Sequence, residues 1–364
     1  MIKLLSSARI TVVCLFLLFI LTFWGTVAQV EHGLYLAQER YFNSFFFLAA
    51  SFIPFPGGQL VLWILFVNLI CATFVRFMHY RRWTYIGILI IHFGLLLYLL
   101  SAFLVFHASK ESRITLAEGQ STNVSISYFD WELAYWKETG HEPRISAIET
   151  KLFKPGYQVP FKTNEFVLTV NQYYTNADAY ASASQQPATV NASGIGTLKP
   201  KPLVTEREQN VPGAEFDLVL NNKHYNLMLY GDEEVPTQIT ANGVVYNFIL
   251  RRKRTPLPFS IQLDKFKAEF HPGTQTAKSF ESDVTFSNQS LKRQVKIYMN
   301  NPLRFKDYTL FQASYSNDSK GRQYSTLAVV KNYARFLPYI ACFVVFFGLA
   351  LHFMIQALTS KAKR

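Results

Sequence analysis

Four long apolar runs constrain this chain more than any other feature of its sequence. Each run is close to the roughly 20 residues that an α-helix needs to cross the hydrocarbon core of a bilayer. The sequence therefore predicts a membrane protein with four transmembrane α-helices, three near the N-terminus and one near the C-terminus. The runs lie at about residues 10–30, 60–77, 84–106 and 337–358.

The first and the shortest apolar stretches need separate interpretations. The run at 10–30 is longer than the 7 to 15 apolar residues typical of a signal peptide and has no small-residue cleavage site after it, so we expect an uncleaved helix. The stretch at 41–53 ends at Pro54 and is too short to span. We expect it to be an interfacial or re-entrant segment on the outer face.

The positive charges that flank the apolar runs predict the topology. They fall on one side of the membrane if the helices alternate, which is the positive-inside pattern. We therefore expect a multi-pass protein of the bacterial cytoplasmic (inner) membrane with both termini cytoplasmic. The cations are Lys3, Arg9, Arg76, Arg81, Arg82, Lys361, Lys363 and Arg364.

The segment between the third and fourth runs then faces the periplasm. Its charges nearly balance, so the formal net charge of +12 does not indicate nucleic-acid binding. Alternating apolar residues around the turn signals at 221–222 and 242–243 predict a β-rich extracytoplasmic domain, an antiparallel sandwich or open barrel. The expected divisions are 1–106 (membrane), 107–335 (extracytoplasmic, with a flexible loop at 174–212) and 336–364 (closing helix and basic tail).

The cysteines and the missing motifs exclude several functions. Cys14, Cys71 and Cys342 all lie in apolar runs, so the exported segment has no disulfide, and the sequence has no CxxCH heme-attachment motif. The chain is therefore not itself a c-type cytochrome. It also lacks a paired-carboxylate site, a phosphate-binding glycine loop and a Ser-His-Asp arrangement, so we expect no catalytic site of its own.

Two histidines lie inside apolar runs, where an ionisable group usually indicates function. His92 is the only side chain of the third run that ionises near neutral pH, and a neutral imidazole there can ligate heme iron. The alternative is a hydrogen bond to another helix. Counting from the inner helix ends puts His352 of the fourth run at a similar depth, so a bis-histidine pair is possible, with a packed or partner-facing histidine as the alternative.

Three weaker candidates are closer to water. His32 and His107 lie at the outer ends of the first and third runs, either as heme ligands at an exit site or simply solvated. The run Arg251 to Arg254 (RRKR) suits heme propionates, anionic lipid or a partner, but a solvated hairpin edge is the favoured interpretation.

Several stretches resemble the ResB family of cytochrome c biogenesis. They are WGT at 24–26, IIHFGLLLYLLSAF at 90–103, LDKFKAEFHPGT at 263–274, SFESDVTF at 279–286 and NNPLRFKDYTLFQASY at 300–315. The resemblance implies an accessory subunit of a holocytochrome c synthase (heme lyase) complex. Such a subunit works with a ResC- or CcsA-type membrane partner, moves heme outward, and presents it to CxxCH apocytochrome c, with a thioredoxin-like thiol reductant as a further partner.

The resemblance also implies that the histidine of the third helix, here His92, binds heme b transiently, as a substrate. The tryptophan-rich motif of the partner is missing from this chain, so the chain is not expected to complete ligation alone. The alternative function is a membrane chaperone or scaffold that stabilises the partner and positions apocytochrome without binding heme. The stretches at 263–274 and 300–315 are typical of turns and sheet core, which favours a scaffold role for them.

Overall fold

The computed structural model describes residues 2–50, 52–79, 85–138, 143–162, 165–181, 189–274 and 277–361. The chain divides into two compact units, one formed by Met1–Lys110 with Lys331–Arg364 and the other by Glu111–Val330. Of the cations used to predict topology, Arg81, Arg82, Lys363 and Arg364 lie outside the described residues.

The first unit is helical and carries the membrane spans. Within the described residues, four helices are long and apolar enough to cross a membrane, as the sequence predicts. The first of them bends at Gly33, whose φ of +74° is readily adopted by glycine because it has no Cβ. The helices are α1 (Ile2–Leu5), α2 (Ala8–Ala37), the π-helical turn η1 (Gln38–Phe42), α3 (Gly58–His79), α4 (Ile86–Ala108) and α5 (Leu337–Lys361).

The short apolar stretch at 41–53 forms much of a β-hairpin. Strands β1 (Phe46–Ala49) and β2 (Ile53–Pro56) pair antiparallel, and residue 51 lies outside the described residues. Phe46 and Phe52 are 63% and 75% exposed. The hairpin therefore presents large apolar side chains outward, which suits the predicted interfacial position.

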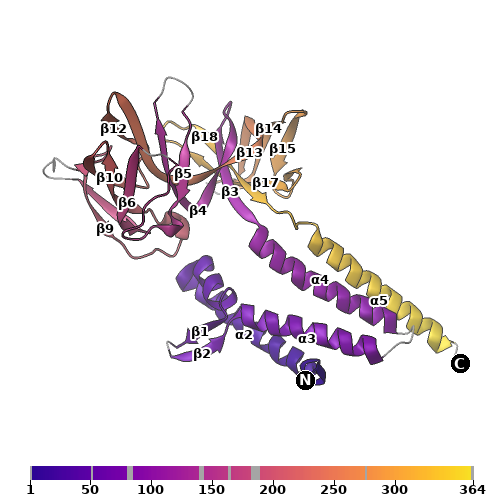
Figure 1. The fold of residues 1–364 in the computed structure, drawn as a ribbon. Coiled ribbons are helices and arrows are strands. Elements are labelled where there is room, and N and C mark those ends of the chain that lie inside the picture. Colours follow the sequence, from indigo (N-terminus) through magenta and orange to yellow (C-terminus); the bar gives the residue numbers. More distant parts are fainter. Residues whose placement is uncertain are drawn as a thin grey trace. The chain divides into compact units, whose positions relative to one another are not determined.

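Helices α4 and α5 pack side by side and antiparallel (Figure 1), and glycines allow their close approach. A methyl group at Gly87 would lie 2.6 Å from the Cα of His352, and one at Gly94 would lie 2.7 Å from Val345. Gly348 of α5 similarly faces Ile90 and Ile91. Small residues at a helix contact are typical of membrane helices, whose association depends on close packing.

The second unit is β-rich, as predicted. Among the described residues its largest sheet has the strand order β15-β14-β13-β4-β3-β18-β17-β16, with β12 paired to β13 and β5 paired to β4; a smaller sheet has the order β6-β10-β11-β8. The strands are β3 (Lys110–Ala117), β4 (Ser121–Lys137), β5 (Ser146–Glu149), β6 (Phe166–Tyr174), β7 (Ala177–Ala181), β8 (Thr189–Val190), β9 (Ile195–Pro200), β10 (Gly213–Leu220), β11 (Lys223–Tyr230), β12 (Thr237–Ala241), β13 (Val244–Phe270), β14 (Ala277–Ser287), β15 (Lys292–Tyr298), β16 (Leu303–Phe305), β17 (Tyr308–Asn317) and β18 (Gln323–Lys331), with 3-10 turns η3 (Thr150–Leu152) and η4 (Arg207–Gln209).

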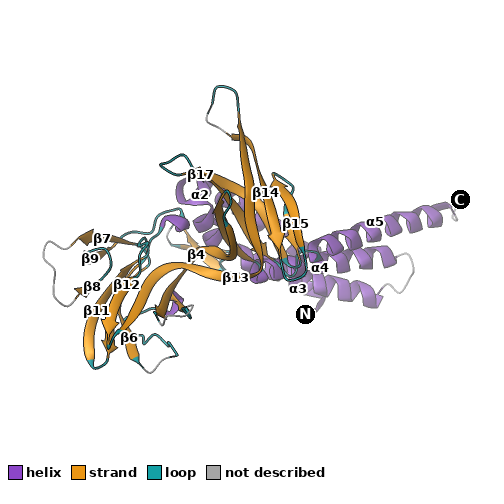
Figure 2. Ribbon diagram, turned by 90° about the horizontal axis from the view of Figure 1, so that it is seen from above, coloured by secondary structure: helices purple, strands orange, loops and turns teal. Residues whose placement is uncertain are grey.

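Strand β13 is 27 residues long and is drawn as one long strand of the β-rich unit (Figure 2). It belongs to two hydrophobic cores. Its first half contributes Phe248 and Leu250 to one core, and its second half contributes Phe259 and Ile261 to the other. Between them its pairing with β4 shifts register at Arg252/Arg254 and at Pro256/Ile261. Such irregularities bend a strand, and here they allow one strand to serve both cores.

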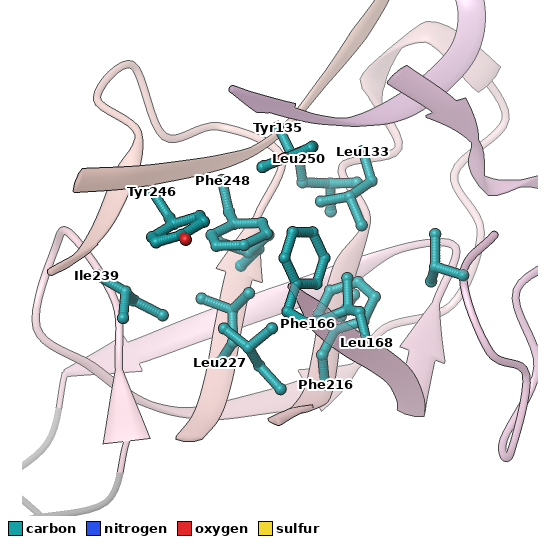
Figure 3. Close-up of a cluster of buried hydrophobic side chains, with 14 of the residues drawn as sticks. Leu133, Tyr135, Phe166, Leu168, Phe216, Leu227, Ile239, Tyr246, Phe248 and Leu250 are labelled. Carbon is teal, nitrogen blue, oxygen red and sulfur yellow. The ribbon is translucent and has the colours of Figure 1, made fainter. Parts of the chain in front are cut away.

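Aromatic rings fill the first core (Figure 3). The ring of Phe166 packs edge-to-face on Phe248 with centroids 5.5 Å apart, and Tyr135 stacks on Phe248 at 5.7 Å. Phe216 and Phe248 are fully buried. The alternation that the sequence shows at 216–220 and 225–229 is the inward face of β10 and β11, which pair as the predicted hairpin.

The stretch at 174–212 differs from the flexible loop that the sequence predicts. Within it β7 and β9 pair antiparallel, and Ile195 and Leu198 are buried in a small cluster with Met228. Small residues in these strands weaken the apolar alternation by which strands are recognised. Residues 182–188 of this stretch lie outside the described residues.

Candidate functional site

The most distinctive polar contact of the membrane unit joins α3 to α4. A guanidinium nitrogen of Arg76 (Nη1) lies 2.9 Å from Nε2 of His92. The other ring nitrogen, Nδ1, lies 2.8 Å from the carbonyl oxygen of Ile88, one turn earlier in α4. His92 is half-buried, whereas Arg76 is exposed. Both nitrogens of this imidazole are therefore held by neighbours from two helices.

These two contacts fix the tautomer of His92. A carbonyl oxygen only accepts hydrogen bonds, so Nδ1 carries the proton and donates it to Ile88. A guanidinium only donates, so Nε2 presents its lone pair to Arg76. The ring is thus neutral, with its lone pair on Nε2 and its orientation set by a backbone carbonyl. Histidines that bind metals are commonly prepared in this way.

An apolar groove runs between the same two helices. Its volume is about 560 Å³, within the range of roughly 300–1,000 Å³ usual for small-molecule and cofactor sites. His92 and Arg76 lie on the adjoining helix faces, because Phe93 and Phe77 directly follow them and successive helical residues turn by about 100°. The groove is lined by Ile70, Thr73, Phe74, Phe77, Leu89, Ile90, Phe93 and Leu96.

The structure does not bring His352 and His92 together. His352 packs at Gly87, five residues before His92 and therefore roughly 7.5 Å from it along the axis of α4. His92 also faces α3 rather than α5. In the described part of the chain, Nδ1 of His352 is buried without a hydrogen-bond partner.

His32 and His107 are both exposed. His107 lies at the end of α4, as its position predicts, whereas His32 lies inside α2 beside the bend at Gly33, because the helix continues to Ala37. His32 lines an open hollow of about 490 Å³ with Arg40 and Tyr41. The His107 ring packs against Phe103 and Phe106, with centroids 4.3 and 5.0 Å away. Among the described contacts, neither the His32 nor the His107 imidazole lies against His92.

The run from Arg251 to Arg254 is not a solvated hairpin edge, because it lies inside the long strand β13, where it pairs with β4, and its first three side chains are partly buried. Arg251 forms a buried ion pair with Glu132, Nε to Oε1 2.9 Å. Arg252 stacks over Trp131 with its guanidinium carbon 4.1 Å from the ring centroid. Burial lowers the pKa of Arg252 to about 10, so it stays charged at neutral pH. The run therefore helps to hold β13 against β4 and is not a free basic patch.

The stretch at 300–315 has structural contacts throughout. Asn300 adopts a positive φ of 66° at the turn after β15, and Leu303 is buried in the second core. Gln312 accepts a hydrogen bond from the buried Ser282 hydroxyl at 2.7 Å and donates one to Ser325 at 3.0 Å. Tyr315 packs on the ring of Phe266. These contacts agree with the scaffold role favoured for this motif.

Arg76 is the residue of this site that the sequence analysis missed, because it was counted only as a topology-setting charge. One signal could have identified it. Arg76 lies three residues before the end of α3 and His92 six residues after the start of α4, so a short connection places both near the same end of the helix pair.

Comparison with known proteins finds a match within the β-rich unit. Residues 226–323 match the model of the ResB-like family. Protein NrfI of Wolinella succinogenes is 32% identical over 96 residues, which is 26% of this chain and 10% of that protein. The chain thus matches only a small part of the length of this relative. The match to the family model includes the stretches at 263–274, 279–286 and 300–315, on which the resemblance in the sequence rests.

Proposed function

Because this chain is ResB-like over residues 226–323, we propose that it is a subunit of a cytochrome c biogenesis complex that holds heme during its outward transfer. Heme b is the substrate rather than a resident cofactor. The chain passes it, together with a ResC- or CcsA-type membrane protein, to CxxCH apocytochrome c kept reduced by a thioredoxin-like protein. In this proposal the chain is an accessory subunit of a holocytochrome c synthase.

His92 is the proposed iron ligand, and its hydrogen bonds are the observation that carries the proposal. Its Nδ1–H is anchored on the carbonyl of Ile88 at 2.8 Å, which leaves the lone pair on Nε2, the atom that iron would take. The groove beside the pair supplies apolar and aromatic surface for a porphyrin. The residues present therefore fit a heme ligated by His92, with His352, His107 and His32 as lesser candidates.

The proposed setting is the bacterial inner membrane, with both termini cytoplasmic and the β-rich unit in the periplasm. Four apolar helices within the described residues support a membrane location. An odd number of spans before the β-rich unit and one after it put both ends of the chain on the same side. The basic residues Lys3 and Arg9 at the N-terminal end support a cytoplasmic assignment of that side.

The test is a heme spectrum of the full chain purified with its membrane partner. We expect a Soret band in the wild type, its loss or displacement in His92→Ala, and recovery with added imidazole, which replaces the missing ligand. The matched control is His224→Ala, which removes an exposed imidazole that belongs to no candidate ligand set. An unchanged band and unchanged holocytochrome yield in His92→Ala would refute the ligand assignment.

A scaffold that does not bind heme is the second candidate, and the buried motif contacts favour it. Gln312, Ser282 and Ser325 form a hydrogen-bonded group inside the sheet, so the ResB-like stretch shapes the exported unit. Under this alternative His92→Ala leaves heme content intact, whereas Gln312→Leu, which removes polar partners from Ser282 and Ser325, lowers the yield of mature cytochrome.

A further inference from the structure

The contact between Arg76 and His92 has a chemical consequence for any metal that binds this imidazole. Nε2 of a neutral imidazole has one lone pair, and that lone pair accepts a hydrogen bond from the Arg76 guanidinium, 2.9 Å away. Iron would use the same lone pair. The guanidinium must therefore move before His92 can ligate iron.

The charge of Arg76 determines where the guanidinium would go. Among the described residues it forms no ion pair, and the side-chain carboxylates of the membrane unit, Glu31 and Glu39, belong to the far end of α2 and to η1. The end of α2 that meets α3 near Asn68 is the opposite one, as the 2.8 Å hydrogen bond from Thr11 to Asn68 shows. Arg76 is thus a cation without a carboxylate partner beside an apolar groove.

A heme carries both groups that this arrangement lacks. Its iron needs a neutral nitrogen ligand, and its two propionates are carboxylates that a guanidinium binds with charge-assisted, often bidentate hydrogen bonds. We propose that Arg76 covers the iron-binding nitrogen of His92 in the heme-free protein and transfers to a heme carboxylate when His92 takes the iron.

This inference rests on the proposed function of His92 and adds a substrate requirement to it. One hydrogen bond breaks, between Arg76 and Nε2, and is replaced by a guanidinium–carboxylate pair and an iron–nitrogen bond. Arg76 is exposed and its side chain is long, so it can leave Nε2 without displacing packed core residues. A porphyrin without free carboxylates would gain the iron bond but would leave the displaced guanidinium unpaired. The site should therefore select for heme with free propionates.

The experiment compares two hemes on the full chain in detergent micelles. Ferric heme and its dimethyl ester, in which both propionates are blocked, are titrated separately, and the Soret band reports ligation. We expect the wild type to bind the free acid about 10- to 100-fold more tightly than the ester, the range that a charge-assisted hydrogen bond supplies. Arg76→Gln should lose most of that preference while keeping the band of a His92-ligated heme.

Two further variants make the result specific. Arg76→Lys keeps the charge without the planar fork and should show a smaller preference than the wild type. Arg9→Gln removes another exposed arginine of the membrane unit, and the preference should stay as in the wild type.

Equal affinity of the wild type for the two hemes would overturn the role of Arg76 without relying on any variant. A preference that persists in Arg76→Gln would overturn it as well. Failure of the proposed function looks different, because His92→Ala would then retain the band with both hemes. If His92→Ala loses the band while the wild type shows no preference, the ligand stands and only Arg76 is wrongly assigned.

Discussion

Replacing Glu132 by alanine should destabilise the β-rich unit strongly, because it leaves a buried guanidinium without its counter-ion. Glu132 and Arg251 face each other across β4 and β13 with Nε and Oε1 2.9 Å apart, and their side chains are only 6% and 13% exposed. Removing one partner of such a pair costs about 3–5 kcal/mol. Arg254 adds to the loss, since it lies close enough to Arg251 for the two charges to repel.

The measurement is thermal unfolding of the full chain in detergent, followed by the β-sheet circular dichroism signal. For a unit of this size 1 kcal/mol shifts Tm by about 2–4 °C, so Glu132→Ala should lower it by roughly 6–20 °C. The double variant Glu132→Leu with Arg251→Met should recover most of the loss, because no buried charge is left unpaired.

The matched control is Glu269→Ala, which breaks an ion pair with Lys267 whose side chains are 50% and 57% exposed. Exposed pairs contribute at most about 1 kcal/mol, so its Tm should fall by no more than about 4 °C. Equal shifts for Glu132→Ala and Glu269→Ala would refute the reasoning that burial makes the first pair critical.

Two further perturbations test the packing and the electrostatics. Gly94→Leu should lower the Tm of the helical signal through a clash with Val345 worth about 1–3 kcal/mol, whereas Leu95→Phe on the exposed face of α4 should not; equal shifts would contradict the close contact of α4 and α5. The hydrogen bond from Lys253 at 2.5 Å lowers the pKa of Glu149 below its usual range, so the carboxylate stabilises the fold above about pH 4 and this contribution is lost as pH falls further. Wild type and Glu149→Gln should differ by less than about 1 kcal/mol in stability near neutral pH, and the corresponding difference in Tm should vanish in acid. A Tm difference that does not depend on pH would show that the ion pair does not cause it.

The membrane part of the fold could be predicted from sequence because the bilayer imposes a length and a composition on every span. His92 was also identifiable, since one ionisable side chain stands out in an apolar run. Its partner was not, because Arg76 has the position expected of a charge that sets topology. Arg76 lies inside α3, which ends at His79, and its side chain is directed toward His92 of α4; the sequence shows the position of this charge but not the direction of its side chain.

The relation between the two buried histidines shows what residue counting cannot supply. Depth was counted from the predicted inner ends of the helices, but α5 continues to Lys361 and His352 packs beside Gly87 near the start of α4. Helix ends need not be level, so the register of α4 against α5 is set by side-chain packing. Here it is set by the close approach of Gly87 to the backbone of His352 and of Gly348 to the backbone of Ile91. The direction in which each imidazole points around its helix is also set by packing, and the sequence pattern alone does not show it.

In the β-rich unit, strands with strong apolar alternation could be predicted from the sequence, whereas strands with weak alternation could not. β10 and β11 have large apolar residues at every second position, whereas β7 (ADAYA) and β9 (IGTLKP) do so only partly. The RRKR run misled for a related reason. Its charges suggested water, but pairing with Glu132 and stacking on Trp131 allow arginine to lie within a central strand.

Strand β13 also determines how the β-rich unit should unfold. Because the same continuous backbone contributes residues to both cores, neither core can unfold completely without removing part of the wall of the other. Mild heating or denaturant should therefore melt the unit in a single cooperative transition. Limited proteolysis should yield either the intact unit or small peptides, with no stable half-sized fragment.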